Sequence, residues 1–272
     1  MLASLLTPGV FRRIRSRYPL IGAIIYEGPS MLDGAPIVVV ATGIGTKSSD
    51  NEKTGKMIQT WIMRADIDPL SAIRSDDDSS VCGDCVHRGQ SAGKGRSCYV
   101  LVFQAPLGVW RAYKRGRYVR ADSAQKRAEL GRDRMVRCGS YGDPASVPAY
   151  VWGDILSGSE GWTGYTHSPT RGSGPALKGV CMASADTLRG ARKLQRSGWR
   201  TFRVMTGSER VSKGEALCPA SEEAGQLTSC EKCSLCQGSY RSGAKSVAIH
   251  AHGTPGNNAR RNVQRRLQMA KA

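Results

Sequence analysis

The stretch MVRCGSYGDPASVPAYVWGDIL, residues 135–156, decides the fold. Its first seven residues predict a β-strand that ends at the turn Gly142-Asp143-Pro144. Residues 147–156 then place apolar side chains at helical spacing and stop at Ser157-Gly158. A strand followed within a few residues by a helix is the unit from which parallel sheets are built, so this stretch predicts a βα unit.

The same alternation continues on both sides of this unit. Further strands are predicted at residues 36–42, 57–63, 162–167, 179–184, 199–205 and 246–250, with a helix over 185–197. The run PIVVVAT, residues 36–42, is continuously apolar and is typical of a strand buried on both faces. No glycine-rich dinucleotide fingerprint is present. We therefore predict an α/β fold, a full or partial (β/α) barrel with cysteine-rich metal-binding loops.

The chain divides into three predicted parts. Residues 1–27 form a basic N-terminal arm, residues 28–253 form the barrel-like domain with cysteine groups at 82–98 and 218–236, and residues 254–272 form a basic C-terminal tail or helix. A length of 272 residues with 40% hydrophobic residues is enough to bury a core. The short apolar start is followed by arginines, and no apolar run is long enough to span a bilayer. We expect no signal peptide and no membrane contact.

The balance of charge points to a polyanionic partner. The formal net charge is +18, which suits a protein that meets nucleic acid. In residues 110–120, aromatic side chains interleave with basic ones, a mixture that lets bases stack while cations take phosphates. A basic helix that packs its aromatics on the domain is the alternative. The predicted nucleic-acid contacts are Arg111, Lys114, Arg115, Arg117 and Arg120, together with Arg260, Arg261, Arg265 and Arg266 in the tail.

Seven of the nine cysteines fall into two metal-ligand patterns. The first is Cys82-x-x-Cys85 followed after twelve intervening residues by Cys98, and the second is Cys218 followed after eleven intervening residues by Cys230-x-x-Cys233-x-x-Cys236. Thiolates two residues apart turn toward one ion or cluster, and sulfurs from nearby chain complete the shell. The spacing favours iron–sulfur clusters of the 4Fe-4S type, two if both groups are filled, over zinc. Free thiols in such patterns also favour a reducing cytosol over disulfide bonds.

The two groups differ in how complete they are. Four cysteines close the C-terminal shell unaided, which suggests electron relay or structural support. The first group lacks a fourth ligand, for which His87, Cys138 and Cys181 are the candidates. Cys138 and Cys181 each lie inside an apolar strand, where a thiol also packs as a small hydrophobe.

Polar residues stand where the predicted strands end. In a barrel the chemistry collects at the carboxyl ends of the strands, so Asp143, His167, Asp186 and Arg203 are the candidate catalytic residues. Asp143 and His167 suggest a general acid–base pair. The run Asp76 to Asp78 is expected to be a solvated loop.

The segment TSCEKCSLCQG, residues 228–238, followed by VAIHAHG, residues 247–253, resembles the carboxyl end of the bacteriophage gene product eighty-eight family. RCGSYGD (137–143), GYTH (164–167) and MASAD (182–186) resemble strand ends of that family and of phage proteins that look like radical-SAM barrels. The likeness covers roughly residues 80–253. It implies a phage origin, hence the cytoplasm of an infected bacterial host, and a metal cluster.

The likeness to radical-SAM barrels implies S-adenosylmethionine as a further cofactor, with Tyr99 and Ser184 as candidate cofactor contacts. Radical-SAM enzymes usually carry C-x-x-x-C-x-x-C in one loop, whereas the first cysteine group here has a different spacing. The departure puts cleavage of that cofactor in doubt.

Two functions of different class follow. The first is a phage iron–sulfur enzyme that performs redox or radical-type chemistry on nucleic acid or a nucleotide. The second is a non-catalytic nucleic-acid-binding protein in phage replication or regulation, which metal only stabilises. The sequence has no P-loop, no His-Glu-x-x-His helix, no Gly-x-Ser-x-Gly turn and no zinc deaminase signature, which argues against those enzyme classes.

Overall fold

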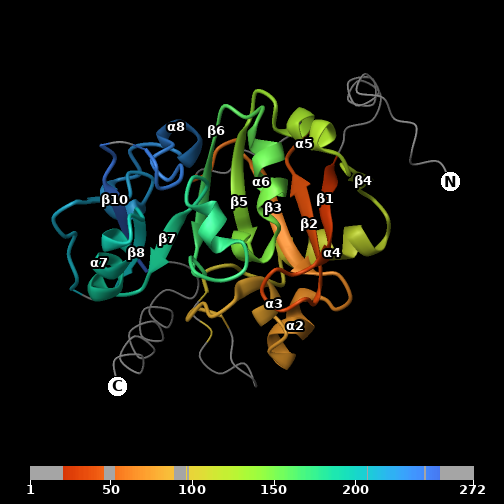
Figure 1. Cartoon of the computed structure of the whole chain (residues 1–272), viewed down its shortest axis with the longest axis horizontal. Helices are drawn as coiled ribbons and strands as arrows, with labels where there is room; N and C mark the ends of the chain where they lie inside the picture. The colour runs from red at the N-terminus through yellow and green to blue at the C-terminus, as the bar shows by residue number, and fades with distance from the viewer. Residues whose placement is uncertain are drawn as a thin grey trace.

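A single ten-stranded sheet forms the centre of the molecule (Figure 1). This computed structural model describes residues 21–45, 53–88, 96, 98–206, 208–241 and 243–251. The strands are β1 (Gly22–Pro29), β2 (Pro36–Thr42), β3 (Ile58–Arg64), β4 (Val119–Arg120), β5 (Met135–Tyr141), β6 (Gly161–Thr166), β7 (Met182–Ala185), β8 (Thr201–Met205), β9 (Glu215–Leu217) and β10 (Ser246–His250).

The strand order is β4-β1-β2-β3-β5-β6-β7-β8-β10-β9. β2 is antiparallel to β1 and to β3, and all other pairs are parallel. The predicted α/β class is confirmed. A full barrel is wrong for the described residues, because β4 and β9 are the two edges of the sheet and do not pair. A closed (β/α) barrel needs parallel strands joined by crossover helices, whereas β2 runs antiparallel to both of its neighbours.

The helices are α2 (Pro69–Ser75), α3 (Ser79–Cys82), α4 (Ala105–Lys114), α5 (Ala124–Gly131), α6 (Ala149–Leu156), α7 (Leu188–Arg196) and α8 (Cys230–Cys233). Three short 3₁₀ helices, η2 (Pro144–Ser146), η3 (Gly174–Leu177) and η4 (Glu222–Ala224), lie in the loops. Helices α5 and α6 lie over one face of the sheet (Figure 1). Trp152 and Ile155 of α6 are fully buried in the largest core cluster on this face.

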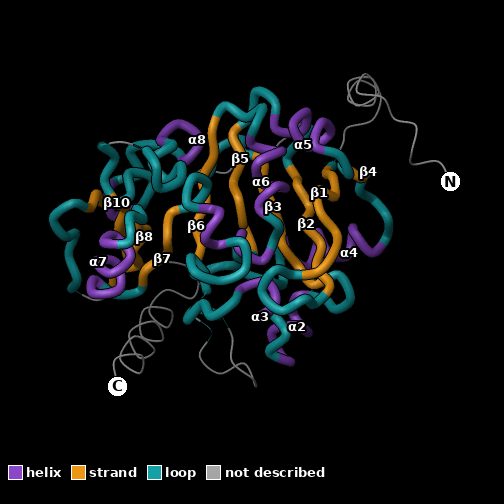
Figure 2. Tube along the Cα trace, in the orientation of Figure 1, coloured by secondary structure: helices purple, strands orange, loops and turns teal. Residues whose placement is uncertain are grey.

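Two separate parts of the chain pack on the other face of the sheet. Over β1–β3, apolar side chains of α2 and α4 pack on Val38, Val40 and Met63. Over β7, β8 and β10, the cover is residues 218–241, here called the cysteine segment, whose Cys218 and Cys236 pack on the strands. Figure 2 shows that this segment is mostly loop. A loop without long helices buries little apolar area of its own, so its position depends on specific bonds.

Local signals explain why the elements start and stop where they do. Asp68 caps α2 by accepting hydrogen bonds from the amides of Leu70 and Ser71. Thr187 caps α7 in the same way at Gly190, and Gly198 ends that helix region at a φ of 77°. The predicted strands at 36–42, 135–141 and 246–250 have the bounds of β2, β5 and β10, and the ends of the others differ by up to three residues.

The N-terminal boundary needs correction. β1 begins at Gly22, so residues 22–27 belong to the sheet and not to a basic arm. The rest of the arm, the C-terminal tail and the predicted contacts Arg260, Arg261, Arg265 and Arg266 lie outside the described residues. Within the described ranges, every helix is too short or too polar to cross a membrane.

Candidate metal centres

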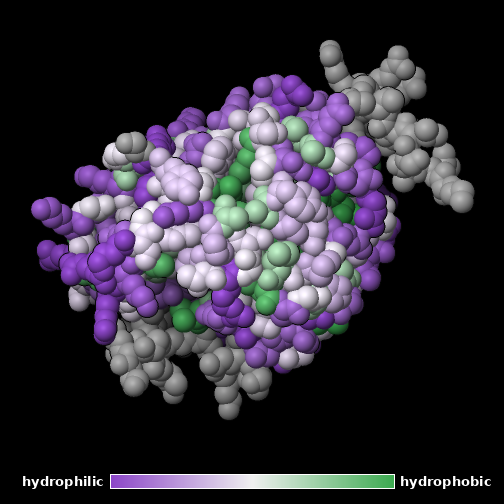
Figure 3. All heavy atoms as spheres, viewed as in Figure 1, coloured by the Kyte–Doolittle hydropathy of each residue, from purple (hydrophilic) through white to green (hydrophobic). Residues whose placement is uncertain are grey.

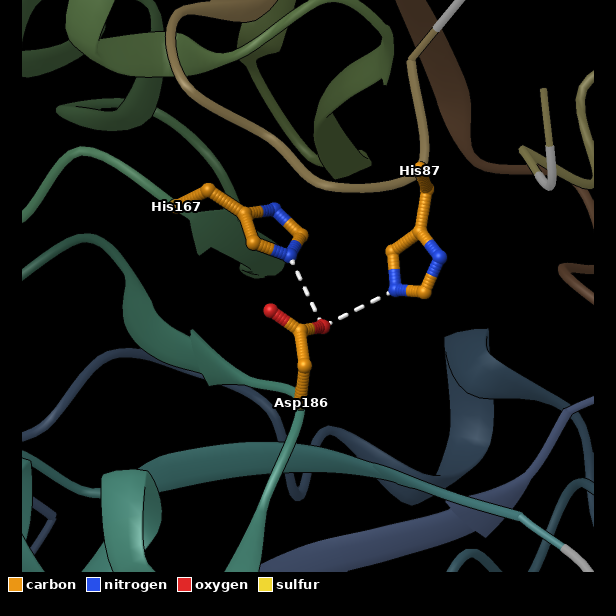
Figure 4. Close-up of side chains that lie close together, drawn as sticks. All are labelled: His87, His167 and Asp186. Atoms are coloured by element: carbon orange, nitrogen blue, oxygen red, sulfur yellow. Dashed lines mark hydrogen bonds and ion pairs between the residues drawn. The ribbon is translucent and has the colours of Figure 1, made fainter. Parts of the chain in front are cut away.

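His87, His167 and Asp186 meet at one point, and we call them the edge cluster (Figure 4). Oδ1 of Asp186 lies 2.9 Å from Nε2 of His87 and 3.4 Å from Nε2 of His167. The three side chains are between 12% and 21% exposed. Nitrogen and oxygen atoms that converge in this way are the ligand set of many transition-metal sites.

The parallel sheet places two members of this cluster. His167 directly follows β6, and Asp186 directly follows β7, which is the next strand in the sheet. Parallel neighbours end at the same edge, so residues that follow them come together. His87 arrives from the loop after α3. That loop turns at Gly83, whose φ is 55° and whose missing Cβ leaves room for Oγ of Ser168, 2.5 Å from the position a Cβ would take.

Cys82, Cys85 and Cys98, here called the edge cysteines, lie beside the edge cluster. Cys98 donates its amide to the carbonyl of His87 at 2.8 Å, which brings the third cysteine back to the first two. Burial raises the pKa of Cys82, and the nearby charges of Asp78, Cys85 and Cys98 raise it further. Burial lowers the pKa of His167, but Cys85 and Asp186 outweigh burial and raise it well above its usual value.

Several polar atoms around the edge cysteines have no hydrogen-bond partner among the residues that the structure describes. The hydroxyl of Tyr141 is buried without one, and so are Oδ2 of Asp78 and both terminal nitrogens of Arg96. The pKa of Tyr141 is raised well above normal by burial and by Cys82. Buried polar groups without partners are rare and carry a free-energy cost. Their position next to three thiols fits a site built around a further polar group.

The acidic run at 76–78 was expected to be solvated, and this is wrong for Asp78. Its side chain is fully buried and lies 2.5 Å from Arg88 and 3.7 Å from Arg96. A buried carboxylate requires a partner of opposite charge, and the sequence offers no local sign of these arginines.

The other two candidate catalytic residues, Asp143 and Arg203, are not members of the edge cluster and have structural partners. Asp143 accepts hydrogen bonds from the backbone amides of Ala145 and His167, so it does not pair with the imidazole of His167. Arg203 is 1% exposed and binds both carboxylate oxygens of Glu215 at 2.8 and 2.7 Å. These contacts make Asp143 a capping residue and Arg203 half of a buried ion pair.

The second group forms a pocket. Cys218, Cys230, Cys233 and Cys236 all line it, together with Thr163, Tyr165 and Val247 from the sheet. We call it the cysteine pocket. It holds about 290 Å³ of empty space, including its open mouth. All nine cysteines are free thiols. The predicted convergence of these four residues is therefore present in the geometry.

Main-chain contacts hold the cysteine segment in place. Arg200, at the start of β8, donates to the carbonyls of Leu235, Gly238 and Lys245 at 2.6 to 2.8 Å. The amide of Cys230 donates to the carbonyl of Lys53 at 2.8 Å. Lys53 precedes β3, so the cysteine pocket faces the amino end of that strand. Figure 1 accordingly shows α8 near one end of the strands and α3 near the other end.

Two cations influence the cysteine pocket. The pKa of Cys236 is raised to about 12, chiefly by burial. Burial also raises the pKa of Cys230, and the nearby positive charges of Arg137 on β5 and of Lys53 lower it in part. Arg137 also donates to the hydroxyl of Tyr99 at 2.7 Å. Tyr99 follows Cys98 in the chain, so Arg137 and Tyr99 connect the two cysteine groups.

Cys138 and Cys181 do not belong to either group. Both are completely buried in the core cluster beneath α6, and the Cβ position of Gly164 lies 3.0 Å from the sulfur of Cys181. They pack as small hydrophobes, as one of the two interpretations predicted. Ser184 is half-buried on β7, two residues before Asp186.

The basic segment 110–120 packs its aromatics inward. Trp110 donates to the carbonyl of Arg64, and Tyr113 donates to Glu27. These contacts are those of the alternative interpretation, a basic helix that packs its aromatics on the domain, and base stacking on these partly buried rings stays a prediction. Arg120 is ion-paired with Glu27, and Lys114 contacts the Ala65 carbonyl. Arg111, Arg115 and Arg117 are exposed.

Helix α7 carries a second basic surface that the sequence analysis did not identify. Arg189, Arg192, Lys193 and Arg196 are all exposed. Hydrophilic side chains cover this end of the molecule in Figure 3. The helical spacing of these residues was visible in the sequence, but their common face became evident only once α7 was seen packed on β7 and β8.

Comparison with protein-family models, with curated proteins and with solved structures produced no match.

Proposed function

We propose that this chain is an iron–sulfur enzyme of phage origin that performs redox or radical-type chemistry on nucleic acid or a nucleotide. The observation that carries the proposal is the position of the edge cysteines. They lie beside two histidines and an aspartate at the carboxyl edge of parallel strands. In parallel α/β sheets this edge is where ligands bind and chemistry occurs.

The spacing of the sulfurs supports iron–sulfur clusters over zinc. Four thiolates bound to one zinc ion at about 2.3 Å would lie roughly 4 Å from one another. Among the described residues, the set of three ligand atoms found within 4.8 Å of one another is the edge cluster, and it contains no sulfur. A single zinc ion therefore does not fit three sulfurs of either group as they lie, whereas thiolates that bind different irons of one cluster are spaced more widely.

Each cysteine group has a distinct role in this proposal. Cys218, Cys230, Cys233 and Cys236 would hold a cluster with all four positions filled, which supplies electrons or stiffens the cysteine segment. Cys82, Cys85 and Cys98 would hold a cluster with one open position, the arrangement that S-adenosylmethionine would need. A bound cluster supplies one-electron chemistry.

The chain's own residues supply the surroundings of the reaction. The hydroxyl of Tyr141 and the terminal nitrogens of Arg96, which is ion-paired with Asp78 at 3.7 Å, have no hydrogen-bond partner among the described residues and lie near the edge cysteines, so they are candidate donors for a bound anionic group. Tyr99 and Arg137 lie between the two cysteine groups. The exposed arginines of α4 supply phosphate contacts for a nucleic acid.

The exposed cations also favour a second candidate, a binding protein that metal only stabilises. Both basic surfaces, at the end of α4 and on α7, consist of side chains directed into solvent. Such surfaces bind phosphates without regard to sequence. This candidate requires no chemistry at the edge cysteines.

One measurement separates the two candidates. Anaerobically purified protein is analysed for iron, zinc and acid-labile sulfide, and its visible and EPR spectra are recorded before and after S-adenosylmethionine is added. We expect about eight irons and a similar amount of sulfide per chain. C85S should retain about half of that iron, and C138A, which alters a thiol outside both groups, should retain all of it. Zinc without sulfide would contradict the enzyme and favour the binding protein.

A further inference from the structure

The edge cluster brings nitrogen and oxygen ligand atoms from three separate segments of the chain to one point. Both imidazoles direct Nε2 to the same carboxylate oxygen, Oδ1 of Asp186 (Figure 4). The contact from His167 is 3.4 Å, longer than the 2.7 to 3.2 Å that is usual for a hydrogen bond to oxygen. The rings lie edge to face, with centroids 5.8 Å apart, so they converge at their nitrogen atoms and do not stack.

These distances are those of ligands around one metal ion. Two atoms bound to one ion at about 2.0 to 2.1 Å lie roughly 2.9 Å apart at a right angle and roughly 3.4 Å apart at the tetrahedral angle. The observed separations of 2.9 and 3.4 Å match both values. All three ligand atoms lie within 4.8 Å of one another.

The rest of the fold holds the three side chains in this arrangement. His167 is fixed through its backbone amide by Asp143, which is itself buried. The carbonyl of His87 accepts from the amide of Cys98. Asp186 is held between β7 and the cap of α7 at Thr187. A metal site needs ligands positioned before the ion arrives, because flexible ligands lose entropy on binding.

We propose that His87, His167 and Asp186 bind a single divalent transition-metal ion, separate from any cluster at the edge cysteines. Two imidazoles and one carboxylate are the ligand set of mononuclear Fe(II) and Mn(II) sites, and they leave further positions open for water or for an oxygen atom of a substrate. The inference goes beyond the proposed function, because its three ligand atoms are nitrogen and oxygen, and Cys85, an edge cysteine within hydrogen-bonding reach of His167, is a neighbour of this site and not one of its ligands.

Mn²⁺ is the probe that tests this site, because it prefers nitrogen and oxygen ligands and is bound poorly by thiolates. The full chain is treated with a chelator, desalted and titrated with MnCl₂ while the EPR signal of free Mn²⁺ is recorded. We expect one tightly bound Mn²⁺ per chain. The electron spin echo of the bound ion should show modulation from two histidine nitrogens.

Three variants locate the ion. D186N and H167Q should each weaken Mn²⁺ binding by about 100-fold or more, since each loses a direct ligand and loss of an outer partner alone costs 10- to 100-fold. D154N is the matched control, because Asp154 is also a half-buried carboxylate in an ion pair, with Arg127, and lies outside the cluster. It should bind Mn²⁺ as the wild type does.

Two results would overturn the assignment. One is a wild-type chain that binds no Mn²⁺ tightly, which needs no variant to interpret. The other is bound Mn²⁺ without modulation from nitrogen, or bound equally well by D186N, which would place the ion elsewhere. Iron and sulfide content is measured separately, so failure of this site and failure of the proposed clusters are distinguishable.

Discussion

The cysteine pocket and the edge cysteines lie on the same sheet but in different surroundings. The cysteine pocket lies against one face of the sheet, with Cys218 and Cys236 packed into a small apolar cluster. The edge cysteines lie at the carboxyl ends of β6 and β7, among charged and polar groups without full hydrogen bonding. The difference teaches that similar ligand patterns can stand in different surroundings, and on the proposed function it assigns them different purposes: the first would hold a segment onto the sheet, and the second would form the reactive site.

The strongest test of this comparison is C236S. The cysteine segment has only a small core of its own, so most of its stability should come from bound metal, whose binding energy is folding energy. We expect loss of the metal from this pocket and a destabilisation of more than about 5 kcal/mol, measured by denaturant unfolding. C138A is the control and should keep its metal. A C236S chain with unchanged metal content and stability would contradict the supporting role.

The next effect concerns the ion pair that joins β8 to β9, directly before Cys218. Arg203 and Glu215 are each 1% exposed at their side chains. R203M should cost about 3–5 kcal/mol, because it leaves a buried carboxylate without its partner. The double variant R203M/E215L should recover most of that loss. If R203M instead left stability unchanged and abolished activity, Arg203 would be catalytic as the sequence predicted.

The same pair predicts a dependence on pH. Burial raises the pKa of Glu215, but hydrogen bonds from Arg203 outweigh burial and hold it below its usual value. A carboxylate with a lowered folded pKa stabilises the fold above its unfolded pKa, about 4.3, and this contribution is lost as the pH falls through the folded pKa. Thermal melts from pH 6 to pH 3 should therefore show a steeper acid decline for the wild type than for R203M/E215L. Parallel curves would contradict the assignment.

At the carboxyl edge, C85S should change stability little. Cys85 lies in a loop and is not part of a core cluster, so we expect a loss of about 1 kcal/mol or less. The iron bound by the edge cysteines should nevertheless be lost, and any effect of S-adenosylmethionine on the spectrum with it. If C85S destabilised the chain as much as C236S, the two cysteine groups would share one supporting role.

The smallest expected effect is on nucleic-acid binding. R115A/R117A removes two exposed charges, so the slope of log K against log salt should decrease by about 2, equally for different sequences. R132A/K213A removes two exposed charges elsewhere and is the control. An unchanged slope, with a decrease for R192A/K193A instead, would move the contact surface from α4 to α7.

Much of the fold could be predicted from local pattern. The run at 36–42 and the βα unit at 135–156 were recognisable because the burial of a strand and the spacing of a helix are written into neighbouring residues. The short helices α2, α3 and α8 were missed, because brief elements carry little periodicity, and β1 was assigned to the basic N-terminal arm although it is the longest strand. The prediction of a closed barrel was wrong because strand order depends on pairing between segments that are distant in the sequence.

The candidate sites show the same division. The sequence by itself determined the two cysteine patterns and named His167 and Asp186 as candidate catalytic residues and His87 as a candidate ligand, because ligand spacing and strand ends are local properties. Only the tertiary structure decided that His87 meets Asp186, 99 residues away, that Arg203 binds Glu215, and that Asp78 is buried against Arg88. Such pairs form because the order of the parallel strands brings their ends together, and no pattern of neighbouring residues contains that order.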